Sequence, residues 1–293
     1  GVRVYSSIDN NNYDLNSGTS IACPNVTGAS ALLYQRYRQL HGGQNPHGAL
    51  IKTLLMNGST DIDIPGPDFG YGFGLLNTGH SLAMMNGNQY FTDTINTTQE
   101  HNYTITIPAN TTKAKIMLYW NDPASAPLTT HALINDLDLT VITPASATLL
   151  PLILDTLPSQ VATPAAPGVD RLNNAEQVTI NNPVAGTYTI KVKGFNVPEI
   201  DQEYFVAYDL EQDGVKLQYP FGGESLSLDS LVIYWEASAG TNTFTLSYST
   251  DNGSNWNTIS NSIAANIRHY VWYPPVSIAS NQWLITIQRK STS

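Results

Sequence analysis

The sequence predicts a short α/β segment followed by two all-β sandwich domains. Apolar residues recur at helical spacing within the first ninety residues. Beyond residue 91 they lie in short runs rich in β-branched and aromatic side chains. The turn Asp251-Asn252-Gly253 between two such runs predicts a hairpin in the last segment. A chain of 293 residues has room for about two domains or a little more.

Composition narrows the class of protein. Hydrophobic residues make up 41% and charged residues 12%, which suffices for packed cores and is unlike a disordered chain. A net charge of −10 argues against nucleic acid and anionic membranes as partners, and fits a soluble protein or a cation binder. No stretch reaches the roughly 18 apolar residues of a membrane span. The single cysteine, Cys23, excludes an internal disulfide framework.

Residues 1–90 predict a strand, a long helix and two shorter helices. The strand is "GVRVYSS", and the long helix over residues 23–43 ends at Gly42 and Gly43. The helix places these apolar residues at near-helical spacing: Val26, Ala29, Leu32, Leu33, Tyr37 and Leu40. "NPHGALIKTLLMNGS" predicts the second helix, and a Gly-rich turn leads into the third.

The rest of the chain predicts strands only. Residues 91–212 contain "HNYTITIPA", "KAKIMLYW", "LDLTVITP", "EQVTINNP" and "GTYTIKVKGF", separated by turn residues. We interpret this segment as a jelly-roll β-sandwich. Residues 213–293 repeat the pattern and predict a smaller sandwich of immunoglobulin or fibronectin type, with its Trp and Tyr residues in the core.

Ser20 stands out because small residues flank it at the start of the long helix. A serine there can simply cap the helix, and this interpretation stays open. The backbone N–H groups and positive dipole end of a helix N-terminus also suit a nucleophile that must stabilise a developing oxyanion. We expect Pro24 to be tolerated because it falls in the first turn, where no backbone N–H is needed.

"GVRVYSSIDNNNYDLNSGTSIACPNVTGASALL" resembles the subtilisin-like serine proteases around their catalytic serine. The resemblance continues through "ALIKTLLMNGS" to "GYGFGLLN". It implies that Ser20 is the nucleophile of a serine endopeptidase with protein or peptide substrates. It also implies that residues 1–90 are the C-terminal part of the family's parallel-sheet catalytic domain.

The partners of the serine are missing from this chain. In the family the order is Asp, then His, then Ser, and the oxyanion asparagine also precedes the serine. Only 19 residues precede Ser20, and all six histidines follow it: His41, His47, His80, His101, His131 and His269. One of these histidines could act as the base for Ser20 only in a triad that arose by convergence, and such a triad would need a new fold around the matching motif.

We therefore interpret Gly1 as the edge of a fragment, and expect the chain to be inactive without the N-terminal part of the catalytic domain. The apolar faces of the first two helices should then lack their partner sheet and form an exposed patch.

"KIMLYWNDPAS", "ALINDLDLTVITP" and "GVDRLNNAEQVTINNPVAGTYTIKVKGFNVP" together resemble the jelly-roll domain of a subgroup of secreted bacterial subtilases. Asp136 and Asp138 lie two apart on a strand, so both carboxylates face one side. Asp170, Asn173 and Glu176 form a second oxygen-rich group. Such hard oxygen ligands predict a structural Ca²⁺ site. The alternative is that these residues form turns and cap backbone N–H groups.

The last segment resembles immunoglobulin-like modules at the C-termini of secreted bacterial enzymes. We expect the protein to be secreted, extracellular or at the cell surface. The alternative to a protease is a non-catalytic, calcium-stabilised binding or spacer module of a degraded subtilase. An Asp motif and a His motif in the upstream chain would distinguish the two.

Overall fold

The computed structural model describes residues 4–199, 201–220, 230–238, 240–275 and 280–290. Gly1, which we expected to be the edge of a fragment, lies outside these residues. The described chain consists mostly of antiparallel strands with three α-helices, which confirms the β-rich prediction for the part beyond residue 90. It forms two compact units, Gly1–Leu210 and Glu211–Ser293. No described helix has the length and apolar character needed to cross a membrane.

The chain opens with a hairpin of β1 (Val4–Ile8) and β2 (Asn12–Asn16). Asn10 and Asn11 adopt φ angles of 62° and 55° in its three-residue turn, a left-handed conformation that Asn adopts more readily than most residues. The sequence predicted only the first strand, followed by a loop. Since β1 and β2 are antiparallel, the parallel-sheet segment expected for residues 1–90 stays a prediction.

Three helices follow: α1 (Thr19–Leu40), α2 (Gly48–Asn57) and α3 (Thr78–Asn86). Because α1 begins at Thr19, the expectation that Pro24 lies in the first turn is wrong. The missing N–H of Pro24 is the one that would bond the carbonyl of Ser20. That carbonyl therefore receives no intrahelical bond from residue 24.

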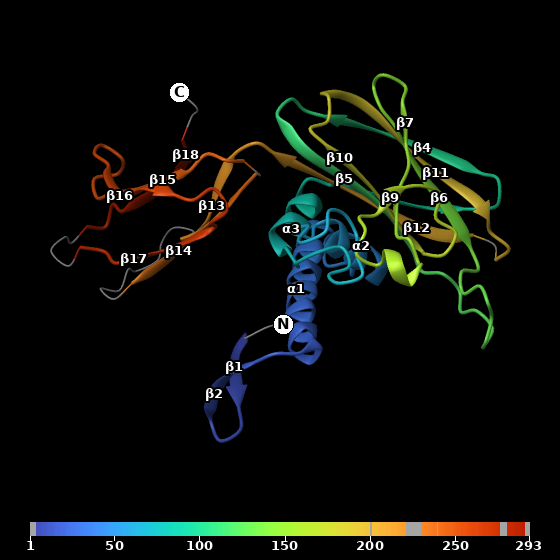
Figure 1. The fold of residues 1–293 in the computed structure, drawn as a ribbon, viewed down its shortest axis with the longest axis horizontal. Helices are drawn as coiled ribbons and strands as arrows, with labels where there is room; N and C mark the ends of the chain where they lie inside the picture. The colour runs from blue at the N-terminus through green and yellow to red at the C-terminus, as the bar shows by residue number, and fades with distance from the viewer. Residues whose placement is uncertain (1–3, 200, 221–229, 239, 276–279, 291–293) are drawn as a thin grey trace. The chain divides into compact units, whose positions relative to one another are not determined.

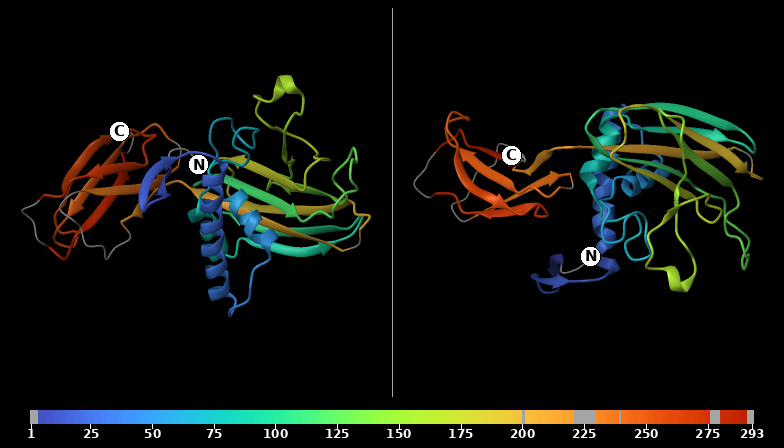
Figure 2. Two further views of the ribbon diagram at one scale, coloured as in Figure 1. Left: turned by 90° about the horizontal axis from the view of Figure 1, so that it is seen from below. Right: turned by 45° about the horizontal axis from the view of Figure 1, so that its top comes forward.

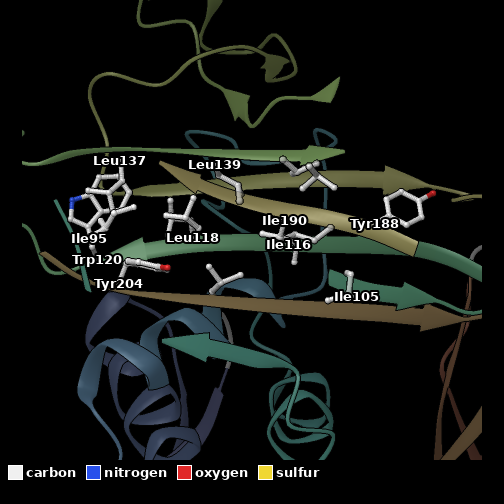
Figure 3. Packing of buried hydrophobic residues seen from close by; sticks show 14 of the residues in the cluster. Ile95, Ile105, Ile116, Leu118, Trp120, Leu137, Leu139, Tyr188, Ile190 and Tyr204 are labelled. Carbon is white, nitrogen blue, oxygen red and sulfur yellow. The ribbon is translucent and has the colours of Figure 1, made fainter. Parts of the chain in front are cut away.

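Two four-stranded antiparallel sheets of the first unit enclose one apolar core. Their strand orders are β10-β5-β12-β3 and β4-β11-β6-β7. The strands are β3 (Tyr90–Ile95), β4 (Glu100–Ile107), β5 (Thr111–Trp120), β6 (Asp136–Ile142), β7 (Thr148–Leu149), β10 (Ala175–Asn181), β11 (Gly186–Asn196) and β12 (Gln202–Gln212). Figure 3 shows Leu118 and Trp120 of β5 among Leu137 and Leu139 of β6 in this core. A short ladder of β8 (Leu152–Ile153) and β9 (Ala166–Pro167) lies in the loop after β7.

The helices pack against the other face of the β5–β12 sheet. Leu50, Leu54 and other buried residues of α2 share a second apolar core with Tyr119 of β5 and with Phe205 and Ala207 of β12. Figure 1 shows the three helices gathered beside this sheet. The expectation that the second helix lacks a partner is therefore wrong, because the sheet covers it.

The expectation of an exposed apolar face fits the first helix better than the second. α1 buries Ala29 and Leu33 but leaves Val26, Leu32 and Leu40 exposed. None of residues 19–28, the N-terminal part of α1, is buried, and Figure 2 shows the β1–β2 hairpin next to this end of the helix. The N-terminal half of α1 is thus the less supported part of the helical segment.

Asn57 fixes the end of α2 to the sheet through buried hydrogen bonds. Its Nδ2 donates to the carbonyls of Lys115 (3.1 Å) and Ala207 (3.3 Å), and Gln177 Nε2 donates to its Oδ1 (3.0 Å). Asn57 is completely buried, so every one of these groups would lose its partner away from water if the side chain were removed.

Six short strands among the described residues of the second unit form its own core. They are β13 (Val215–Tyr219), β14 (Leu231–Ala237), β15 (Phe244–Ser249), β16 (Asn257–Ile263), β17 (His269–Trp272) and β18 (Leu284–Arg289). Two three-stranded sheets, β13-β14-β17 and β16-β15-β18, contribute to this core. Trp235 and Trp272 lie in it with Phe244. Tyr234, Trp256 and Tyr273 are exposed, so the prediction that the Trp and Tyr residues of this segment form its core is confirmed only in part.

The Asn57 contacts predict that the helical segment and the sheet unfold together. Asn57→Ala should lower the free energy of unfolding of the first unit by about 2–4 kcal/mol, because it orphans several buried polar groups. Asn86→Ala, which removes only an exposed bond to Arg36, should cost under about 0.5 kcal/mol. Denaturant unfolding of both variants provides the measurement. Equal, small losses would contradict the coupling.

Candidate functional site

Ser20 is exposed at the second position of α1. The N-cap residue is Gly18, whose carbonyl accepts hydrogen bonds from the N–H groups of Ile21 (3.2 Å) and Ala22 (3.3 Å). Gly18 has a φ of 152°, a backbone conformation that residues with a side chain rarely adopt. No side chain caps this helix end, so the alternative that Ser20 serves as the cap is wrong. The hydroxyl is left at the positive end of the helix dipole.

None of the six histidines, all within the described residues, hydrogen-bonds to Ser20. His41 lies against Tyr37 and Tyr90, and His47 pairs with Glu203. His80 pairs with Asp209, and His101 with Tyr204. His131 is exposed in a loop, and His269 lies beside Tyr234 in the second unit. The described residues therefore hold no histidine base for Ser20, and a convergent triad has no support.

Asp136 and Asp138 project from one side of β6, as predicted, and share one partner. Arg171 Nη1 donates to Asp136 Oδ1 at 3.1 Å and to Asp138 Oδ1 at 2.5 Å. The Arg171 guanidinium also lies over the ring of Phe195, 3.6 Å from its centroid. The sequence analysis missed Arg171, although it stands inside the quoted "VDRLNN" motif.

Asp170 and Asn173 behave largely as turn residues. Asp170 Oδ1 accepts from the N–H groups of Leu172 (2.8 Å) and Asn173 (3.0 Å). Asn173 Nδ2 donates to Asp170 Oδ2 at 2.8 Å, and Asn173 is exposed. For this pair the alternative interpretation of backbone capping describes the contacts present.

Glu176 is the most enclosed member of the predicted set, at 2% exposure. Its Oε2 accepts a hydrogen bond from the N–H of Leu139 at 2.6 Å, whereas its Oε1 has no partner among the described residues. Burial and the nearby carboxylates raise the pKa of Glu176 to about 9. Burial also raises the pKa of Asp136 to about 6, although Arg171 opposes the rise.

The predicted carboxylates are neighbours but not a closed cage. No three of Asp136, Asp138, Asp170 and Glu176 bring ligand oxygens within 4.8 Å of one another. Asp138 and Glu176 line a cavity of about 240 Å³ together with Glu100, Lys191 and Lys193. Oε1 of Glu176, which has no hydrogen-bond partner among the described residues, and the excess of carboxylates over cationic side chains both fit a site for a hard cation. Arg171, however, occupies the position between Asp136 and Asp138 where such a cation would bind these two carboxylates.

A second group of titratable side chains, His80, Lys115 and Asp209, was missed because its members are far apart in the sequence. Asp209, 4% exposed, lies 2.7 Å from His80 Nδ1 and 3.6 Å from Lys115 Nζ. Lys115 also donates to the carbonyl of Ser59 at 2.7 Å. The lysine already supplies a positive charge there, and the group ties α3 to β5 and β12.

Comparison with known families supports the two resemblances. Residues 3–74 match the subtilase family (Peptidase S8), and residues 99–194 match the bacterial pre-peptidase C-terminal domain. Ser20 lies in the first match, and all five predicted metal ligands lie in the second. The chain thus contains one segment that matches the subtilase family and a second that matches a C-terminal module, in line with the resemblances found in the sequence.

Relatives resemble this chain over parts of their length. A Dictyostelium discoideum serine protease/ABC transporter B family protein, tagA, is 27% identical over 216 residues, which is 64% of this chain and 12% of that protein. Subtilisin DY from Bacillus licheniformis is 38% identical over 77 residues, 26% of this chain and 25% of that protein. The crystal structure of Bacillus licheniformis lipase BlEst2 in its propeptide form covers 69% of this chain and 43% of its own, at 8% identity and a TM-score of 0.26.

Glu176 predicts a pH dependence for the metal-free chain. Its pKa is about 9 when folded and near 4.5 when unfolded, so unfolding releases a proton between these values. Stability should therefore fall as the pH rises from about 4.5 to about 9. Glu176→Gln should be more stable than wild type by roughly 1–3 kcal/mol at pH 8, with little difference at pH 4.5.

Thermal melts in EGTA across this pH range provide the measurement. Glu100→Gln is the matched control, because Glu100 lines the same cavity but is exposed and pairs with Lys191. It should leave the slope nearly unchanged. A wild-type melting temperature that rises over this pH range would contradict the assignment.

Proposed function

We propose that residues 1–90 complete the catalytic domain of a secreted serine endopeptidase and that Ser20 is its nucleophile. One observation carries the proposal: Ser20 lies exposed and uncapped at the N-terminus of α1, inside the segment that matches the subtilase family. Protein or peptide chains are the proposed substrates. The Asp, the His and the oxyanion asparagine would come from chain outside these residues.

The chemistry proposed for Ser20 follows from its position. Its hydroxyl would attack the scissile carbonyl after losing its proton to the histidine base. The negative charge that develops on the carbonyl oxygen would lie near the backbone N–H groups and the dipole at the start of α1. Without the base the hydroxyl is a weak nucleophile, so we propose that this chain alone is inactive.

Ser20→Ala in the longer parent protein should lower kcat by about 10⁶-fold, the loss seen when the nucleophile of such a triad is removed. Ser30→Ala is the control, because Ser30 lies on the same helix and its hydroxyl bonds only the Val26 carbonyl. It should retain nearly full activity. Peptidase assays of the three proteins compare these values, and an active Ser20→Ala enzyme would overturn the assignment.

The β-rich part of the first unit is proposed to be a jelly-roll module that a structural Ca²⁺ stabilises. Asp136, Asp138, Asp170 and Glu176, with Asn173 at the rim, would hold the ion, which would offset the repulsion among the carboxylates. The unpartnered Oε1 of Glu176 favours this proposal. If the parent protein lacked the Asp and His motifs, the remaining function would be that of this module, which would act as a binding or spacer domain.

Calcium should raise the melting temperature of the first unit. Binding to the folded state alone contributes about 2.7 kcal/mol at a hundredfold excess over Kd. For a unit of this size that corresponds to roughly 5–10 °C. Melts of the 293-residue chain in calcium and in EGTA test this, and Asp138→Asn combined with Asp170→Asn should abolish the rise. Identical wild-type melting temperatures in both buffers would remove calcium from the account.

A further inference from the structure

Arg171 lies in the middle of the carboxylate cluster. It donates to Asp136 and Asp138, and its Nη1 also donates to the carbonyl of Asp170 at 3.0 Å. Burial tends to lower the pKa of Arg171, but the hydrogen bond and charge of Asp138, with the charge of Asp136, raise it overall, so the guanidinium stays charged. One internal cation thus serves two carboxylates and one backbone carbonyl.

The guanidinium does not satisfy the whole cluster. Glu176 Oε1 is buried and lacks a partner among the described residues, although it lines a cavity that Asp138 also lines. A buried, unpartnered carboxyl oxygen is costly, and a cation that reached Glu176 through the cavity and displaced its carboxyl proton would relieve that cost. The site therefore has a position that Arg171 leaves unused.

We propose that Arg171 is a built-in competitor of the divalent cation: it holds Asp136 and Asp138 in the metal-free chain and must withdraw before these carboxylates can ligate the ion. This inference rests on the calcium site proposed above. Arg171 would set the affinity of that site for the ion.

Charge and distance support the competition. A guanidinium that contacts both aspartates would stand within a few ångströms of an ion bound by them, and at that distance two positive charges repel strongly. The two cations therefore exclude each other. Binding of the ion must then include the free energy of breaking the Arg171 contacts, which raises the apparent Kd.

Arg171 also has a place to withdraw to. Its side chain is 35% exposed, and it already lies over Phe195, which is 47% exposed. A guanidinium can keep its contact with an aromatic ring while its head turns toward water. Displacement thus exposes no buried charge.

The test compares calcium binding to the 293-residue chain and to Arg171→Gln by calorimetry. Arg171→Gln should bind calcium at least about 10-fold more tightly. Lys191→Gln is the matched control, because Lys191 lines the same cavity and carries the same charge, yet forms its ion pair with Glu100 and not with Asp136 or Asp138. If only general repulsion matters, both variants should tighten binding equally, and that result would overturn the proposal.

Melting temperatures give an independent readout. In EGTA, Arg171→Gln should melt below wild type because its carboxylates lose their counter-charge, and in saturating calcium the two should nearly coincide. A deficit of equal size in both buffers would show that Arg171 and calcium act independently, and would refute the competition. If Arg171→Gln does not fold in EGTA, Arg171→Lys is measured in its place. Arg171→Lys should bind calcium more tightly than wild type, since an ammonium cannot hold a carboxylate through two N–H groups as a guanidinium does.

The outcomes separate this inference from the calcium site itself. Calcium binding of equal affinity in wild type and Arg171→Gln would refute the competition and leave the site standing. If neither protein binds calcium, both the site and the inference fail. Binding by Arg171→Gln alone would support Arg171 as the competitor in its strongest form.

Discussion

The apolar contact between α2 and the outer face of the β5–β12 sheet is the constraint on which the first unit depends. It joins a helical segment that matches one family to a β-rich module that matches another. Tyr119, Phe205 and Ala207 face the helices, while Trp120, Tyr204 and Val206, their neighbours along the strands, face the inner core. Because strand residues alternate between faces, one sheet can serve both cores. The helical segment is therefore attached to the module and not merely adjacent to it in sequence.

The start of α1 takes little part in this packing. The buried residues of α1, Ala29 and Leu33, lie beyond its first turns, and Ser20 itself is exposed. A nucleophile works only when its base, its orienter and its oxyanion donors are fixed around it. The proposed active site is therefore divided in two: this chain would supply the serine and the helix end, and the longer parent would supply the remaining groups.

Sequence patterns predicted the regular elements well but not the contacts between distant ones. The long periodic runs of α1 and α2 and the strand-like runs of β5 and β11 carry strong local signals. The β1–β2 hairpin was missed because its turn over residues 9–11 lacks the usual glycine. The partner of α2 was missed because nothing local marks Phe205 and Ala207 as facing a helix. The five metal-ligand candidates were named, but the direction of Arg171 depends on how the loop after β9 folds back onto β6.

The central claim is that Ser20 is one half of an active site completed by chain outside these residues. The most direct test treats the longer parent protein and this 293-residue chain with a fluorophosphonate probe and maps the modified peptide by mass spectrometry. The account predicts rapid, stoichiometric modification of Ser20 in the parent and none on the same timescale in this chain. Modification of a different serine in the parent, or equal reactivity of Ser20 in both proteins, would contradict it.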